Sequence, residues 1–256
     1  MNLINLLKNL LNLQKKVDLK TLPSLGLFYK NGFEIYIKKA DMEDIIEYEH
    51  NYIKDDLGLV IHKLKKIVQR NTILPPDYEF EDIKSIDVVF LFLEIVKFTK
   101  GKPISFIYID EEYGNQEMIE FSPNYFNYFQ VEENLLSFYN KENNEFVIDD
   151  FRFCLPSIGL ENCLTNYLIS KSNEPNAIRY NKLNYDFLFF LGDRKKISFP
   201  EIDNLIQIFN YDIDKDEKEK IKNIVNLFQP IQKYSLKKGS KVIEINSQID
   251  LEKIWK

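Results

Sequence analysis

Histidine and cysteine are scarce in this sequence of 256 residues, and their scarcity excludes several classes of site. The two histidines are His50 and His62, and the two cysteines are Cys154 and Cys163. Their spacing fits no zinc-finger pattern. Two cysteines also cannot build a disulfide framework, which favours a reducing compartment. We expect each histidine to be structural or exposed rather than catalytic, and both cysteines to be small buried apolar side chains.

Glycine is also sparse, with eight residues in the chain, and no phosphate-binding loop, dinucleotide fingerprint or nucleophile-elbow motif occurs. No apolar run reaches the roughly 18–20 residues that a membrane-spanning helix needs. Forty acidic residues against 34 basic ones give a net charge of −6, which argues against nucleic-acid binding. The sequence therefore predicts no catalytic residue, no metal ligand and no cofactor, and it favours a protein that is not an enzyme and binds neither nucleic acid nor membrane.

Clusters of like charge offer a few alternatives. The acidic turn Asp110-Glu111-Glu112 is the basis of one of them, a metal-dependent hydrolase, although a solvated turn is the simpler interpretation, as it is for Asp149-Asp150. Asp212, Asp214 and Asp216 resemble the start of a calcium loop. That loop would need Gly where Glu217 stands and Glu where Asn223 stands, so an acidic helix start is favoured. The basic residues Lys63, Lys65, Lys66 and Arg70 are expected to form a solvated helix edge.

The first 17 residues have an amphipathic pattern. Apolar side chains recur at steps of three and four at Leu3, Leu6, Leu10, Leu13 and Val17, with asparagine and lysine on the opposite face. This spacing predicts a helix. Such a helix can pack on its own domain or dock into the groove of a partner. We leave both alternatives open.

The rest of the chain predicts an α+β fold, helix-dominated with several β-hairpins. Asn31-Gly32 between alternating segments predicts a hairpin at about 27–38. Predicted helices cover 40–54, 57–70, 81–99, 158–171, 176–191, 199–209 and 214–228, with Asp41 and Asp214 near helix starts. Predicted strands cover 104–109, 117–121, 145–155, 232–236 and 241–245. We divide the chain into the N-terminal helix 1–17, a mixed region 18–121 and a helical domain 122–256 that ends in a hairpin.

Several short motifs occur in a characteristic order. Leu22-Pro23-Ser24-x-Gly26-x-x-Tyr29 precedes a strand, and Ile86-Asp87-Val88-x-x-Leu91 lies on a long helix that ends at Thr99-Lys100-Gly101. Near the C-terminus a helix is stopped by Gln229-Pro230, and a Lys-Gly hairpin and the apolar segment 251–255 follow. This order resembles that of the baseplate hub proteins of T-even-type contractile-tailed phages. The resemblance covers roughly residues 20–121 and 200–256, and the segment 122–199 has no counterpart in it.

The resemblance implies a non-enzymatic structural or assembly protein of the phage tail. Its partners would be other tail and baseplate subunits, and its place would be the virion baseplate, assembled in the host cytoplasm. A chaperone absent from the mature virion is an alternative within the same family. In either role, apolar anchors would bind the partners. The candidate partner-binding residues are Leu3, Leu6, Leu10, Leu13 and Trp255.

Overall fold

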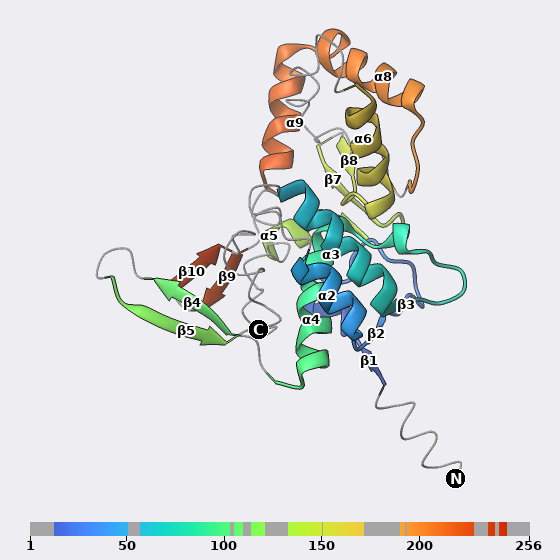
Figure 1. Cartoon of the computed structure of the whole chain (residues 1–256). Helices are drawn as coiled ribbons and strands as arrows, with labels where there is room; N and C mark the ends of the chain where they lie inside the picture. The colour runs from blue at the N-terminus through green and yellow to red at the C-terminus, as the bar shows by residue number, and fades with distance from the viewer. Residues whose placement is uncertain are drawn as a thin grey trace.

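A computed structural model gives the fold of the chain (Figure 1). It describes residues 13–50, 57–102, 105–109, 114–120, 133–149, 151–171, 190–192, 194–227, 235–238 and 241–244. Helices and small antiparallel sheets make up these residues, which confirms the predicted α+β, helix-dominated fold. Predictions that concern residues 1–12, 121–132, 172–189 and 245–256 lie outside the described residues.

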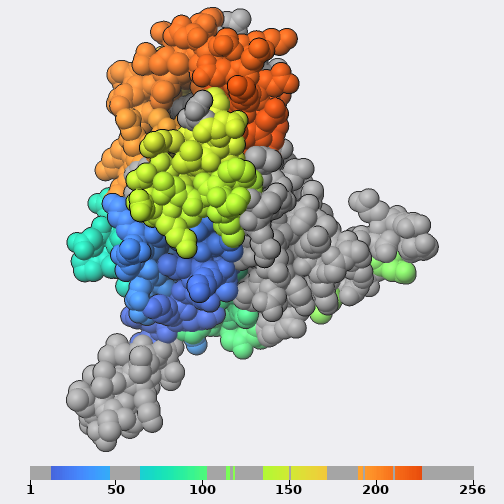
Figure 2. All heavy atoms as spheres, turned by 180° about the vertical axis from the view of Figure 1, so that it is seen from behind, coloured from blue at the N-terminus to red at the C-terminus, as the bar shows by residue number. Residues whose placement is uncertain are grey.

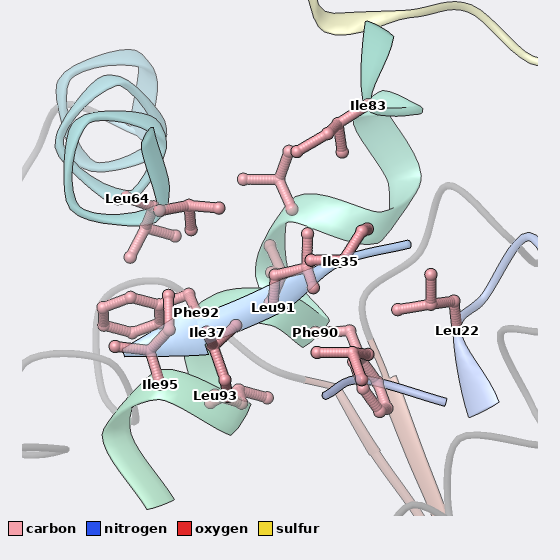
Figure 3. Packing of buried hydrophobic residues seen from close by; sticks show 14 of the residues in the cluster. Leu22, Ile35, Ile37, Leu64, Ile83, Phe90, Leu91, Phe92, Leu93 and Ile95 are labelled. Carbon is pink, nitrogen blue, oxygen red and sulfur yellow. The ribbon is translucent and has the colours of Figure 1, made fainter. Parts of the chain in front are cut away.

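The N-terminal half packs a small sheet and two helices around helix α4. The sheet has the order β1 (Gln14–Lys16), β2 (Tyr36–Lys38), β3 (Thr72–Ile73), and the helices are α2 (Met42–His50), α3 (Leu57–Asn71) and α4 (Val88–Lys100). Every residue of α4 from Val88 to Val96 is buried. In Figure 3 side chains of α4 lie between Ile37 of β2 and Leu64 of α3. Because each fully buried large apolar side chain contributes about 1.5–3 kcal/mol, α4 is the main source of stability in this half.

Helix α4 ends where the sequence predicts but begins later. Gly101 closes it with a left-handed φ of 63°, and its N–H donates to the carbonyl of Lys97. The predicted start at residue 81 is wrong, because the segment before Val88 consists of two 3-10 turns, η2 (Phe80–Asp82) and η3 (Ser85–Asp87). Ile83 is extended there, and its carbonyl accepts a hydrogen bond from the Ile158 N–H at 2.8 Å. This contact with a distant segment interrupts the helix.

The predicted N-terminal helix does not extend over residues 14–16, which form β1. This strand pairs antiparallel with β2, and Val17 is buried, with its N–H bound to the Ile35 carbonyl at 2.8 Å. The Lys15 ammonium lies 2.5 Å from the carboxylate of Glu94, which is buried in α4. These contacts join residues far apart in sequence, so a local pattern of leucines cannot contain them.

The hairpin predicted at 27–38 is also wrong. A turn does form at Asn31-Gly32, where the Phe33 N–H donates to the Lys30 carbonyl and Gly32 has a φ of 84°. The chain before this turn, however, is a series of turns from residue 23 to residue 28 and provides no first strand. Strand β2 pairs with β1 and β3 instead.

In its described residues, the C-terminal half combines a second small sheet with four α-helices and a π-helical turn. Its elements are α5 (Glu133–Leu136), β6 (Tyr139–Asn140), β7 (Glu145–Ile148), β8 (Phe151–Phe153), α6 (Ile158–Lys171), α8 (Phe199–Gln207), the π-helical turn η6 (Ile208–Asp212) and α9 (Lys215–Leu227). Helix α6 matches its predicted bounds. The single strand predicted at 145–155 is instead the hairpin β7–β8, which turns at Asp149 with a φ of 52°. Figure 2 shows, from behind, this half stacked on the N-terminal half.

Two further hairpins confirm sequence predictions. Strand β4 (Ser105–Ile109) pairs antiparallel with β5 (Gln116–Glu120), and β9 (Ser235–Lys238) pairs with β10 (Lys241–Glu244). In Figure 1 the hairpin β4–β5 extends to one side of α4. Within the part of the chain that the structure describes, no helix is both long and apolar enough to cross a membrane.

Candidate functional site

The motif Leu22–Tyr29 forms a strained loop. Leu25 and Phe28 have φ angles of 57° and 70°, a left-handed conformation that costs a non-glycine residue about 1–2 kcal/mol. Gly26, between them, has a φ of 73°, and a Cβ there would lie 2.9 Å from the Cβ of Leu19. The loop therefore needs glycine at position 26. It also needs outside contacts that hold it in this shape.

Asp87 provides those contacts. Its Oδ1 accepts the Ser24 N–H at 2.9 Å, and its Oδ2 accepts the hydroxyls of Ser24 and Tyr29, each at 2.7 Å. Asp87 directly precedes α4, a position where aspartate often caps a helix, but its side chain makes no capping hydrogen bond. The carboxylate serves the loop instead. We name Ser24, Tyr29 and Asp87 the Asp87 cluster.

Both hydroxyls of the cluster also accept hydrogen bonds. The Tyr29 oxygen accepts the backbone N–H of Lys84 at 2.9 Å, and the Ser24 oxygen accepts the N–H of Gly26 at 3.2 Å. Each hydroxyl therefore connects a backbone N–H to the carboxylate. Because Tyr29, Ser24 and Asp87 are all buried, water does not replace these bonds easily.

Burial sets the protonation of the cluster. It raises the pKa of Asp87 from 3.8 to about 6, against the opposing effects of the hydrogen bonds from Tyr29 and Ser24 and of the charge of Lys84. Burial, followed by the charge of Asp87, raises the pKa of Tyr29 well above its ordinary value. At neutral pH Asp87 is therefore an anion, and Tyr29 remains a neutral hydrogen-bond donor.

The loop belongs to two hydrophobic cores at once. Leu22 and Tyr29 are buried in the core around α4, where Tyr29 stacks on Phe33 with ring centroids 4.3 Å apart. Phe28 is buried in a second core, where its ring lies 5.4 Å from that of Phe146. Its N–H donates to the Tyr139 hydroxyl at 3.0 Å. The Asp87 cluster therefore fixes the segment that joins the two cores.

Lys84 reinforces the same junction. Its side chain is buried, and its ammonium lies 5.8 Å from the centre of the Phe28 ring, a cation–π distance. Lys84 also forms an antiparallel bridge with Ser157, and the neighbouring Ser85 N–H donates to the Pro156 carbonyl at 3.0 Å. The Asp87 carboxylate is fully buried, and both of its oxygens already accept hydrogen bonds from Ser24 and Tyr29. The chemical role of this arrangement is therefore to hold the loop in position.

The predicted partner-binding residues are not brought together in the described part of the chain. Leu13 lies in a turn before β1 with 55% of its surface exposed. Leu3, Leu6, Leu10 and Trp255 lie outside the described residues, as does the acidic turn Asp110-Glu111-Glu112. The side chains of His50 and His62 are likewise not described.

Other candidates from the sequence have structural roles. Asp214 caps α9, since its Oδ1 accepts the Glu217 N–H at 2.8 Å, which confirms the acidic helix start. Cys154 is buried, with its thiol donating to the Asn144 carbonyl at 3.3 Å, and Cys163 is half-buried; the two form no disulfide. Of the predicted basic edge, Lys65 is paired with Glu161 at 3.1 Å rather than simply solvated. Among the described residues, no three His, Cys, Asp or Glu side chains come close enough to hold a metal ion.

Sequence reasoning did not foresee the Asp87 cluster. It selected Ser24, Tyr29 and Asp87 as parts of a motif order, but it placed Asp87 within a helix and assigned none of the three to a site. The available signal was the presence of both segments in one resemblance.

Comparison of the chain with protein-family models, curated proteins and solved structures found no match.

Proposed function

We propose that this chain is a non-enzymatic protein of a contractile phage tail that acts by binding other baseplate subunits, as a hub component or as an assembly factor. One observation supports the proposal. Residues from the two N-terminal motifs that carry the resemblance, which are about sixty positions apart, meet in the Asp87 cluster. Motif pieces that fold into one junction form a more specific pattern than pieces that are separate in space.

The proposal places the binding surfaces outside this junction. The Asp87 cluster is buried, so its part is to fix the two cores relative to each other and to give the partner-facing surfaces a defined geometry. Pre-ordered surfaces bind more tightly because less conformational freedom is lost on binding. Exposed apolar side chains such as Leu13, Met42 and Ile46 are available on that surface. Leu13 also belongs to the leucine pattern of the N-terminal segment.

The test is affinity purification of the tagged full chain from phage-infected cells, followed by mass spectrometry. The proposal expects hub, tube or tape-measure subunits to be recovered at fixed ratios. Leu13→Glu should lower that recovery, whereas Met118→Glu, the same charge placed on another exposed apolar residue, in β5, should not. Recovery of no tail subunit would refute the proposal.

Mass spectrometry of purified virions then separates the two roles. A hub component should be present in the particle at a constant copy number. An assembly factor should bind tail subunits in infected cells and be missing from the finished particle. Both results agree with a binding function, and they differ in when the protein leaves its partners.

A further inference from the structure

Helices α3 and α6 face each other across a groove of about 300 Å³. This volume is at the lower end of the range for ligand-binding clefts. The groove lies between an element of the N-terminal half and one of the C-terminal half, a common place for binding sites. Side chains from α3, η2 and α6 line it: Lys65, Lys66, Gln69, Phe80, Glu81, Asn162, Thr165, Asn166 and Ile169.

Helix α6 presents a regular stripe to this groove. Leu160, Leu164 and Tyr167 are buried in the core of the C-terminal half. Asn162, Thr165, Asn166 and Ile169 recur at steps of three, one and three on the opposite face, and all of them line the groove. The stripe is therefore polar along two turns and apolar at its end, where Ile169 is 63% exposed.

A salt bridge already joins the two helices beside the groove. The Lys65 ammonium, on a side chain that is 14% exposed, lies 3.1 Å from the Glu161 carboxylate and donates to the side-chain Oδ1 of Asn162 at 3.3 Å. Lys65 therefore holds α3 to α6 and is not available to a ligand. Lys66, next to it in the lining, takes part in none of the ion pairs found among the described residues, and its side chain is exposed.

We propose that this groove binds an extended peptide segment of a partner protein, with a carboxylate of the segment at Lys66 and an apolar side chain at Ile169. The amide side chains of Gln69 and Asn166 each carry a donor and an acceptor, as the peptide backbone does. An extended strand exposes its backbone amides and points successive side chains to opposite sides. Such a segment can therefore bond to the amides while its side chains reach Lys66 and Ile169.

The charge of Lys66 favours a carboxylate at that point of the groove. Lys65 is neutralised by Glu161, which leaves the positive charge of Lys66 and the negative charge of Glu81 in the lining. The Cβ of Glu81 lies near Gly159, close to the N-terminal end of α6 and far along the helix from Ile169. The positive charge of Lys66 thus has no described carboxylate within ion-pair distance, and a partner carboxylate would supply one. The inference deepens the proposed function and rests on it only for the identity of the partner.

The groove can be tested without knowing that partner. A random dodecapeptide library displayed on yeast is selected on the purified full chain, and the enriched peptides are titrated against variants. Lys66→Glu reverses the charge of the groove and Asn166→Tyr fills it. Lys222→Glu makes the same charge change on the exposed face of α9 and is the control. Circular dichroism establishes that each variant is folded.

We expect enriched peptides to share an acidic residue near an apolar one. Their affinity should fall by about tenfold or more in Lys66→Glu and in Asn166→Tyr, and stay unchanged in Lys222→Glu. Absence of enriched peptides, or equal binding to wild type and both groove variants, would overturn the inference. If peptides bind the groove but infected cells yield no tail subunit, the proposed function is refuted and the inference that the groove binds a peptide stands. If tail subunits bind the groove variants as well as they bind wild type, the proposed function stands, but the groove is not the site at which those subunits bind.

Discussion

Removal of one hydroxyl, in Tyr29→Phe, tests whether the Asp87 cluster holds the fold together. Phenylalanine keeps the ring and its stacking on Phe33, whose plane is tilted by 1° from that of Tyr29. The substitution therefore deletes two hydrogen bonds and little else. One is donated to Asp87 at 2.7 Å, and the other is accepted from the Lys84 N–H at 2.9 Å.

The expected loss follows from those two bonds. A hydrogen bond to a charged group contributes about 1.5–3 kcal/mol, and a buried N–H left without a partner costs about 1–3 kcal/mol. Together they predict that Tyr29→Phe lowers the free energy of unfolding by about 3–5 kcal/mol at neutral pH. A loss of this size is a large fraction of the stability of a typical domain.

The loss should also depend on pH. The Tyr29 hydrogen bond lowers the pKa of Asp87, so without it that pKa rises further above about 6. At about pH 5 Asp87 is protonated in both proteins, and the deleted bond then joins neutral groups, which contributes less. Urea unfolding followed by circular dichroism should therefore show a smaller loss at about pH 5 than at about pH 7.

Tyr36→Phe is the matched control. The Tyr36 hydroxyl donates to Glu34 at 2.8 Å on the half-exposed side of β2, where water can replace the bond. Its removal should change the free energy of unfolding by less than about 1 kcal/mol. If Tyr29→Phe is no more destabilising than Tyr36→Phe, or if its cost is the same at both pH values, the account of the Asp87 cluster is wrong.

Three further changes have defined outcomes. The pKa of Asp87 is about 6 in the folded chain and near 3.8 when exposed, so its contribution to stability rises as pH falls from about 6 to about 3.8. Over that interval, urea titrations should show the free energy of unfolding of wild type rising by about 3 kcal/mol relative to that of Asp87→Asn. A difference between the two proteins that does not change with pH contradicts this. Gly159→Ala would place a Cβ 2.3 Å from the Lys195 carbonyl oxygen, so calorimetry should show a lower melting temperature, although alanine has the higher helix propensity. Ser198→Ala removes the capping box with Glu201 at the start of α8 and should lower the free energy of unfolding in urea by about 0.5–2 kcal/mol; an unchanged free energy contradicts this.

Elements whose signals are local were predictable from the sequence. Helix α6 is bounded by Pro156 before it and a polar segment after it, and its bounds were correct. The carboxylates of Asp41 and Asp214 accept backbone N–H groups three residues later, as caps do. The hairpin β9–β10 also follows from a short turn between alternating residues. In each case the residues that determine the structure lie within a few positions of one another.

The incorrect predictions share a different cause. The leucine pattern of the N-terminal segment predicts a helix, but pairing with β2 and the contact between Lys15 and Glu94 make residues 14–16 a strand. The turn at Asn31-Gly32 forms as predicted, yet no hairpin results because Asp87 holds the preceding loop elsewhere. Long-range contacts override local propensity at these positions. Nothing in a window of neighbouring residues specifies them.

The candidate site lies between these two cases. Ser24 and Tyr29 are separated from Asp87 by about sixty residues, so no periodicity links them. Yet a loop with Leu25 and Phe28 in left-handed conformations persists only where its surroundings hold it, and a buried carboxylate persists only where donors surround it. Each feature compensates the cost of the other. Substitution of Tyr29 or Asp87 should therefore disturb both cores together.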